Sequence, residues 1–374
     1  NGLLYEPADN LESSASITID GEIAVNSTSG GPGTVLTVDV AGFGPSEQVR
    51  FEFVDSLGLA EGITTVTTLA SGERSVQFAV PQTPRGDYLI RATGLTGGLV
   101  LDAPYTVTPT IAHPSIFGNP GNLVTFTFKG YLANESIEIV FVHGFGEADE
   151  VIGTVAADAD GAAVLTVTMP PAGRGYHTVR GDGGDGTTTQ STWEVIPKQV
   201  LNRYFGPVGR TIEMTLDGWV RNTEITVRWH ETTSDSSPSV VLGTVVTDNV
   251  GHATYSVVIP EAAVGNHRLE ALGGGNVRHV YCYVQTTMGL STLVGPPGSS
   301  VDASLRGFGA NEQVEVRFFT TATNYIVIAT VGTNGSGSVD TTLVMPSSTR
   351  GAHKLQAVGL TSGVLAQRWF YLAA

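Results

Sequence analysis

The sequence predicts an all-β protein built from four tandem antiparallel β-sandwiches. A Pro-Gly step (Pro-Val-Gly in the third copy), an alternating strand and a Gly-aromatic pair follow one another four times. The glycines of the first step, Gly33, Gly121, Gly209 and Gly298, are 88, 88 and 89 residues apart. A fixed period of this length indicates copies of one structural unit. Apolar and polar residues alternate with period two throughout, and no helical period of useful length occurs.

Two strands open each copy, one on either side of the Gly-aromatic pair. In the first strand Leu36, Val38 and Val40 share one face, and Thr37 and Asp39 share the other. One apolar and one polar face is typical of a strand in an antiparallel sandwich. The second strand predicts the inward residues Val49, Phe51 and Phe53, and in the later copies Ile137, Ile139 and Phe141, then Ile225, Val227 and Trp229, then Val314, Val316 and Phe318.

The second half of each copy contains a strand that ends at a proline, a strand that opens with glycine, and a closing strand. Proline cannot donate a ladder hydrogen bond, so it marks where the first of these strands stops. One column just after the opening glycine holds an aromatic ring in every copy, which predicts a position like the tyrosine corner of sandwiches: Tyr88, His177, His267 and His353. The closing strands predict one inward aromatic column, which consists of Tyr105, Trp193, Tyr281 and Phe370.

These elements divide the chain into four domains, at 21–108, 109–197, 198–286 and 287–374, after an extension at 1–20. The joints fall near Pro109, Pro197 and Thr286, with almost no spacer between domains. Short linkers restrict bending, so we expect an elongated, semi-rigid rod.

The N-terminal extension contains a candidate strand at 15–20. Ile17 and Ile19 stand 88 residues before Tyr105 and Val107, in the columns of a closing strand. Three interpretations follow. The segment is the last strand of a longer array, a donor strand that pairs with the sheet edge of a neighbouring molecule, or a strand folded on the first domain.

Composition disfavours two classes of partner. With 19 basic and 35 acidic residues the net charge is −16, and an acidic surface repels nucleic acid and anionic lipid. No apolar run reaches the length of a membrane span. Cys282 is the only cysteine, so there is no internal disulfide framework, and its place in a predicted strand indicates an inert side chain.

The order of these motifs resembles the bacterial immunoglobulin-like repeats of secreted and cell-surface proteins, in particular the IPT/TIG type. Pro-Gly, Gly-aromatic, a Glu column and Gly-x-(Tyr or His) carry the resemblance over about residues 21–374. The Glu column consists of Glu47, Glu135 and Glu312, whereas the third copy has Thr223 with Glu224 beside it. The resemblance implies four tandem immunoglobulin-like antiparallel β-sandwich domains in an elongated rod, an extracellular location, and no family active site.

No cofactor is expected, although two acidic runs are candidates for binding calcium. Asp158 and Asp160 lie in Asp-Ala-Asp-Gly, and Asp182 and Asp185 lie in Gly-Asp-Gly-Gly-Asp-Gly. Carboxylates in tight turns are typical of oxygen-coordinating loops, although neither run has the full ligand set of an EF-hand. Asp-Gly is also common in hairpin turns, so the alternative is ordinary turn chemistry.

No catalytic constellation is present. The chain has no Gly-x-Ser-x-Gly turn, no phosphate loop and no cysteine with a suitable partner, which predicts a protein that is not an enzyme. Arg180-Gly181-Asp182 is an integrin-type tripeptide that we expect on a hairpin loop.

These observations favour an extracellular structural protein. It is predicted to be a repeating subunit of a cell-surface filament, sheath or layer that self-associates through β-strand edges and the N-terminal strand. The first alternative is an adhesin or stalk that binds carbohydrate or a host surface protein. The second is the spacer region of a larger secreted protein.

Overall fold

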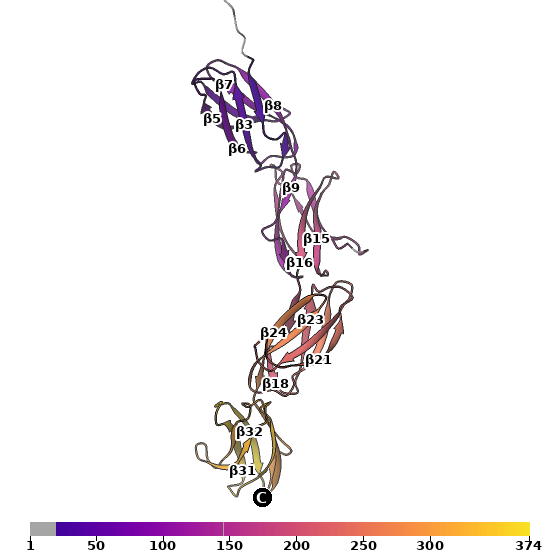
Figure 1. Cartoon of the computed structure of the whole chain (residues 1–374), viewed down its shortest axis with the longest axis vertical. Coiled ribbons are helices and arrows are strands. Elements are labelled where there is room, and N and C mark those ends of the chain that lie inside the picture. The colour runs from indigo at the N-terminus through magenta and orange to yellow at the C-terminus, as the bar shows by residue number, and fades with distance from the viewer. Residues whose placement is uncertain (1–19, 145) are drawn as a thin grey trace, which may run out of the picture.

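The computed structural model describes residues 20–144 and 146–374, and four sandwich units follow one another in this part of the chain. Figure 1 shows them end to end in chain order. Each unit pairs a three-stranded sheet with a five-stranded sheet, so the predicted all-β fold is confirmed. The described residues form no helix, and hence none long and apolar enough to cross a membrane. Ile17 and Ile19 lie outside the described residues.

Unit 1 sets the pattern for the others. Its three-stranded sheet has the order β1-β3-β6 and its five-stranded sheet the order β2-β8-β7-β4-β5. Neighbouring strands are antiparallel except β2, which runs parallel to β8. The strands are β1 (Glu22–Val25), β2 (Ser29–Gly30), β3 (Val35–Ala41), β4 (Gln48–Val54), β5 (Ala60–Thr67), β6 (Arg74–Ala79), β7 (Gly86–Gly94) and β8 (Val100–Val107).

Units 2 to 4 repeat this order of strands. Unit 2 contains β9 (Thr110–Ala112), β10 (Phe117–Gly118), β11 (Leu123–Lys129), β12 (Ser136–Val142), β13 (Glu150–Ala156), β14 (Ala163–Thr168), β15 (Gly175–Gly183) and β16 (Thr188–Val195). Unit 3 contains β17 (Lys198–Leu201), β18 (Phe205–Pro207), β19 (Thr211–Asp217), β20 (Glu224–His230), β21 (Ser239–Val246), β22 (Ala253–Val258), β23 (Gly265–Gly273) and β24 (Asn276–Gln285). Unit 4 contains β25 (Thr287–Leu290), β26 (Val294–Gly295), β27 (Ser300–Arg306), β28 (Gln313–Phe319), β29 (Tyr325–Gly332), β30 (Val339–Val344), β31 (Gly351–Gly359) and β32 (Leu365–Leu372).

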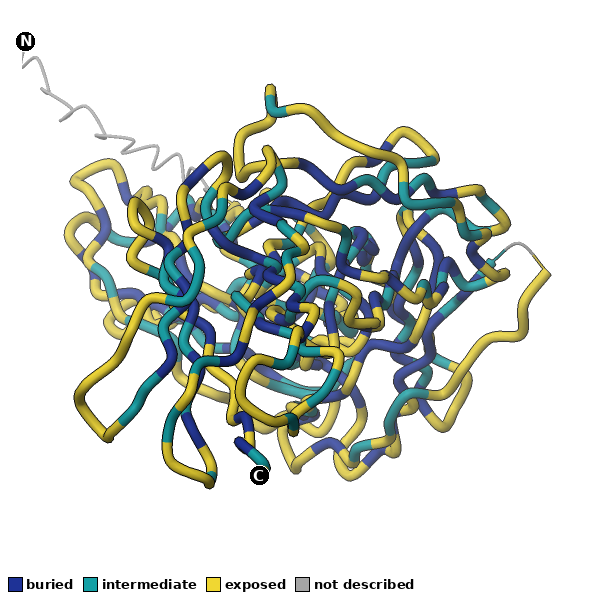
Figure 2. The backbone as a smooth tube through the Cα atoms, turned by 90° about the horizontal axis from the view of Figure 1, so that it is seen from below, coloured by how far each residue is buried: buried dark blue, intermediate teal, exposed yellow. Residues whose placement is uncertain are grey.

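Each unit has its own hydrophobic core between its two sheets. The inward columns predicted for the first two strands are confirmed, since Leu36 and Val38 from β3 and Val49 and Phe51 from β4 are fully buried. Figure 2 looks along the rod and shows buried residues inside, with exposed loops around them. Separate cores mean that every unit buries its own apolar surface, as expected for tandem domains.

The closing strand of unit 3 corrects one predicted column. Cys282 pairs with His267 across the sheet and is fully buried, whereas Tyr281 is 44% exposed. Tyr105, Trp193 and Phe370 are buried as predicted, so Cys282 is the fourth member of their column. The prediction failed because Trp193 and Cys282 are 89 residues apart and not 88, and a shift of one residue moves a side chain to the other face of a strand.

Every five-stranded sheet carries a β-bulge in its outermost strand. The pairing of β4 with β5 shifts between Phe51 and Glu52, and the corresponding pairings shift at the same place in the other units. The extra residue is aliphatic and packs against the core in each unit: Ile63, Ile152, Leu242 and Ile328. A bulge twists an edge strand and disrupts its free ladder, so it makes that edge a poor template for another strand.

Candidate functional site

Asp158 holds a turn together through its own carboxylate. Oδ1 accepts hydrogen bonds from the backbone N–H groups of Asp160 (3.0 Å) and Ala162 (2.8 Å). Asp248 makes the same pair of bonds in unit 3, and Asn334 makes them in unit 4. Because the neutral amide of Asn334 serves equally well, the position requires a hydrogen-bond acceptor and not a charge, as the turn interpretation expects.

Asp182 and Asp185 are paired with arginines. Asp182 Oδ2 lies 3.0 Å from Nη2 of Arg180. Asp185 pairs with Arg85 of unit 1 and accepts a backbone hydrogen bond from Thr187 (3.0 Å). The Thr187 amide, followed by Arg85, lowers the pKa of Asp185 to about 2. No group of three or more His, Cys, Asp or Glu side chains suited to a metal occurs among the described residues, and calcium binding stays a prediction.

The integrin-type tripeptide is not on a loop. Arg180, Gly181 and Asp182 lie inside β15. Arg180 and Asp182 are two residues apart on the same face of the strand and form an ion pair with each other. The prediction of a hairpin location was wrong because the alternation in β15 continues through the glycines to Gly183.

The Tyr/His column has the predicted role. Tyr88 Oη donates to the carbonyl of Pro84 (2.9 Å), and Nε2 of His177, His267 and His353 lies 2.7–2.8 Å from the carbonyl four residues earlier. Each ring also stacks on an aromatic residue of the neighbouring strand, with centroids 4.7–5.0 Å apart. These rings therefore anchor the loop that precedes them. Cys282 is equally structural, because burial raises the pKa of its thiol to about 11.

The Glu column ties together the two turns at the N-terminal end of a unit. Glu47 accepts hydrogen bonds from the N–H groups of Gly44 (2.7 Å), Thr96 (2.9 Å) and Gly97. The Gly97 amide, with those of Gly44 and Thr96, outweighs burial and lowers the pKa of Glu47. Unit 3 has Thr223 in place of this glutamate, and there the β23–β24 hairpin has only Gly274 and Gly275 between its paired ends.

In unit 4 the same role falls to Glu312. Its carboxylate accepts from the N–H groups of Gly309, Thr361 (3.1 Å) and Ser362 (2.9 Å). Burial raises the pKa of Glu312, but the hydrogen bonds from Ser362, Gly309 and Thr361 outweigh burial and lower it. The glutamate of this repeat column is therefore a structural carboxylate.

The joints between units are short and direct. Two residues separate β8 from β9 and β16 from β17, and one residue separates β24 from β25. The glycine of each Gly-aromatic pair lies against the entering linker: a Cβ at Gly130 would stand 2.9 Å from the carbonyl oxygen of Thr108, and one at Gly218 would stand 2.8 Å from that of Ile196. Both glycines have positive φ, so close packing and backbone conformation together explain this part of the repeat.

A second contact at each joint comes from the loop before the strand that opens with glycine. At the first joint Arg85 of unit 1 binds Glu135 of unit 2 (2.7 Å). At the second joint Arg174 donates its N–H to the carbonyl of Trp219 (3.0 Å). At the third joint Val264 donates likewise to Phe308 (3.0 Å), and Arg306 pairs with Glu261 (3.1 Å).

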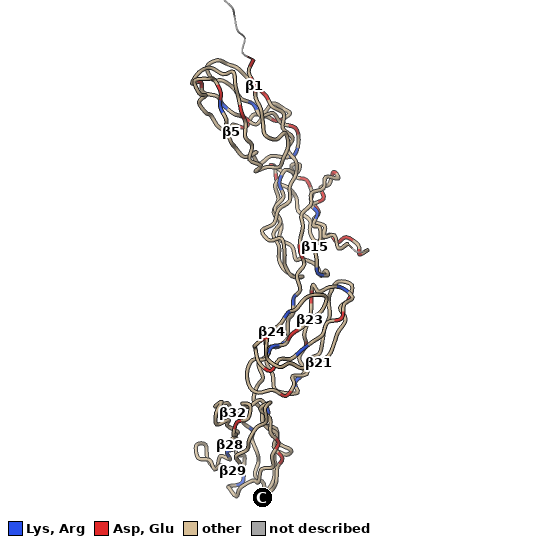
Figure 3. Tube along the Cα trace, in the orientation of Figure 1, with Lys and Arg blue, Asp and Glu red and all other residues tan. Residues whose placement is uncertain are grey.

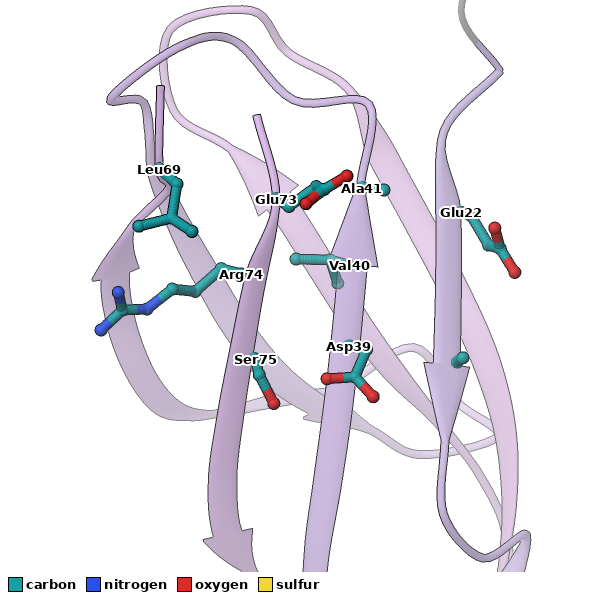
Figure 4. Close-up of a pocket in the computed structure, with 9 residues that line it drawn as sticks. Glu22, Asp39, Val40, Ala41, Leu69, Glu73, Arg74 and Ser75 are labelled. Atoms are coloured by element: carbon teal, nitrogen blue, oxygen red, sulfur yellow. The ribbon is translucent and has the colours of Figure 1, made fainter. Parts of the chain in front are cut away.

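The described surface has shallow, open hollows. One hollow of about 400 Å³ lies on the three-stranded sheet of unit 1, and its lining includes Glu22 on β1, Asp39 on β3 and Arg74 on β6. Figure 4 shows that these side chains are spread over three strands and do not converge on one point. This hollow therefore brings no pair of its charged side chains together at one point.

A second hollow, of about 460 Å³, lies on unit 4 and is lined by Phe319, Lys354 and Trp369. These residues share the outer face of the five-stranded sheet, and Trp369 is 61% exposed. Sequence reasoning did not single them out. The alternation of β32 contained the signal, because an inward Phe370 places Trp369 and Tyr371 outward.

Net charge changes along the rod. Acidic side chains become fewer along the chain: there are 13 in residues 1–108, 10 in 109–197, 8 in 198–286 and 4 in 287–374. The same ranges contain 4, 3, 7 and 5 basic side chains. The resulting charges are −9, −7, −1 and +1. Figure 3 shows that both signs occur in every unit, so the gradient comes from the balance between them.

No protein-family model matches the sequence, and no curated protein does. Among solved structures, the chain is similar to a tetra-tandem repeat in the extending region of a large adhesion protein, with 16% identity, 95% of this chain and 99% of that chain covered, and a TM-score of 0.25. It is also similar to invasin, a bacterial integrin-binding protein, with 12% identity, 95% and 79% coverage and a TM-score of 0.23. At such identities and TM-scores we transfer no function from either protein.

Proposed function

We propose that the chain is an extracellular structural protein, a stiff rod that serves as a repeating subunit of a cell-surface filament, sheath or layer. The observation that supports this proposal is the set of three direct joints. Each has a linker of one or two residues and a contact between the preceding loop and the next unit. Joints of this kind resist bending, which a load-bearing or spacing element requires. Membership of the IPT/TIG type stays a prediction.

The sheet edges limit where such subunits could join. Each five-stranded sheet has a bulged strand at one edge and a strand of only two or three residues at the other. The three-stranded sheets instead end in regular six-residue strands, β6, β14, β22 and β30. Unpaired N–H and C=O groups on a regular edge accept another strand, so we assign strand-mediated assembly to these edges.

Negative-stain electron microscopy tests the proposal. The purified chain should form fibres or sheets, and a chain that starts at Gly21 should give single rods if Ile17 and Ile19 belong to a donor strand. Fibres from both chains would support assembly through sheet edges alone. Single rods from both chains would contradict the filament proposal and favour a stalk or spacer.

An adhesin is the second candidate function. The observation that favours it is the exposed aromatic surface on unit 4, the one unit with a positive net charge. An adhesin would remain a single rod and retain a ligand at that surface. A spacer would do neither.

A further inference from the structure

A row of four side chains crosses the outer face of the five-stranded sheet in unit 4. Trp369 on β32 pairs with Lys354 on β31, and Phe319 on β28 pairs with Tyr325 on β29. Nζ of Lys354 lies 3.6 Å from the ring centroid of Phe319, and the rings of Phe319 and Tyr325 are 5.4 Å apart. The row is therefore continuous, and with strands about 4.8 Å apart it is about 14 Å long.

The row is exposed and bordered by loops. Trp369 is 61% exposed and Tyr325 is 42% exposed. Thr320 and Thr321 on one loop, and Arg350 on another, complete the hollow of about 460 Å³ above Lys354. Large aromatic side chains gathered on an exposed face are typical of a binding surface, because their apolar area is kept from the core.

The fold itself does not require these residue types. In unit 1 the corresponding row consists of Pro104, Leu89, Val54 and Ala60, joined by the same strand pairings. That row contains neither an aromatic ring nor a charge, yet the sheet has the same order of strands. The stability of the sheet therefore does not explain why the row in unit 4 contains aromatic and charged side chains.

Lys354 in the row and Arg350 beside it are available to an anionic ligand. Lys354 and Arg350 form no ion pair with any residue that the structure describes. Arg317 is placed over Tyr325, 4.6 Å from the ring centroid, although it also pairs with Glu315 (3.0 Å). Unit 4 has a net charge of +1 in a chain of −16, so an anionic ligand meets the least repulsion here.

We propose that this row binds an acidic polysaccharide. The apolar C–H faces of the sugar rings stack on Trp369 and Tyr325, and the sugar carboxylates pair with Lys354 and Arg350. A row about 14 Å long suits several consecutive sugars better than a single one. Single-stranded nucleic acid also stacks on aromatic rings. A single-stranded oligonucleotide is therefore the competing ligand in the test below. The binding site is independent of whether the chain polymerises.

Affinity electrophoresis of the full chain with polygalacturonate tests the proposal. The fully methyl-esterified polymer is the matched neutral ligand, because it keeps the backbone and loses the carboxylates. We expect retention by polygalacturonate only, weakened by added salt. Trp369→Ala and Lys354→Gln should each reduce the affinity about tenfold or more. The control Tyr176→Ala, which removes a 71% exposed ring on unit 2, should change nothing.

Each contrary result overturns the proposal. It fails if the chain binds neither polymer, if it binds both equally, or if a single-stranded oligonucleotide binds more tightly than polygalacturonate. It also fails if Trp369→Ala retains full affinity while its unfolding temperature is unchanged. Loss of fibres without any loss of saccharide binding in Trp369→Ala would make the row a contact between copies. That outcome would overturn the binding site and leave the filament proposal standing.

Discussion

At the residue scale, the repeated side chains hold the ends of each unit in place. Glu312 collects three backbone N–H groups from two turns that are about fifty positions apart in the chain. His353 anchors the loop before β31 through the carbonyl of Thr349 (2.7 Å). Asn334 closes a turn with two further backbone bonds. These residues recur because buried or half-buried backbone donors and acceptors need partners in every copy.

Replacement of Glu312 by Gln should loosen the end of unit 4. The carboxylate accepts charge-assisted bonds from otherwise unpaired amides, so we expect a loss of about 1–3 kcal/mol in local opening free energy at pH 7. Hydrogen exchange of residues 309–313 and 360–364 measures it, with unit 1 as internal reference. Glu315→Gln, whose target is an outer-face ion pair with Arg317, is the control and should cost less than about 1 kcal/mol.

The difference in stability between the wild type and Glu312→Gln should also depend on pH. The folded-state pKa of Glu312 is lowered, so its contribution to stability is present above the unfolded pKa of about 4.3 and is lost as the pH falls through the folded value. The difference between the wild type and Glu312→Gln should therefore shrink below about pH 4.3. A difference that stays constant down to pH 2 would contradict the role assigned to the carboxylate.

At the scale of the element, the two sheets of each sandwich differ in their edge strands. The bulges at Ile63 and Ile152 bring an extra aliphatic side chain onto the core and interrupt the outer ladder of β5 and β13. The six-residue strands β22 and β30 have no such bulge where they pair with β19 and β27. Their outer edges are consequently the proposed points of association.

Lysine on these two strands should suppress association. Val258 on β22 and Val344 on β30 are 54% and 57% exposed, and a charge on an edge strand disfavours strand addition. We expect Val258→Lys with Val344→Lys to reduce fibre mass several-fold in sedimentation, with stability changed by no more than about 0.5 kcal/mol. The control is Tyr283→Lys on β24, which pairs with β23 on one side and β18 on the other and is 40% exposed. Equal loss of fibres in the control would refute the assignment to edges.

At the scale of the whole molecule, the units form a rod because each joint has two independent contacts. At the third joint the linker lies against Gly307, and Val264 and Glu261 reach Phe308 and Arg306. One contact alone would leave a hinge, whereas contacts at two separate points oppose rotation. The charge gradient is also a property of this scale, since no single unit contains it.

Three inserted residues at the third joint should release this restraint. A Gly-Ser-Gly insertion after Thr286 separates Val264 from Phe308, and flexible linkers behave as random coils. Small-angle X-ray scattering should then give a broader distance distribution and a shorter mean end-to-end length. The same insertion after Gly58, an exposed loop position with no atom within 4 Å of a Cβ, is the control. An unchanged distribution for the joint insertion would mean that the joints are already flexible.

The sequence predicted the fold class and the inward columns of β3 and β4, because alternation and the Gly and Pro punctuation are local properties of the chain. It misplaced Tyr281, because a one-residue difference between copies reverses the faces of β24. It also placed Arg180-Gly181-Asp182 on a loop, although these residues continue a strand.

By itself, then, the sequence determined the number and kind of units, which depend on a repeated local pattern. Tertiary structure decided the rest. Asp185 meets Arg85 across a joint, and Phe319, Tyr325, Lys354 and Trp369 form one row only after four strands have paired. Neither arrangement has a local signal, because both depend on sheet register and on the placement of one unit against the next.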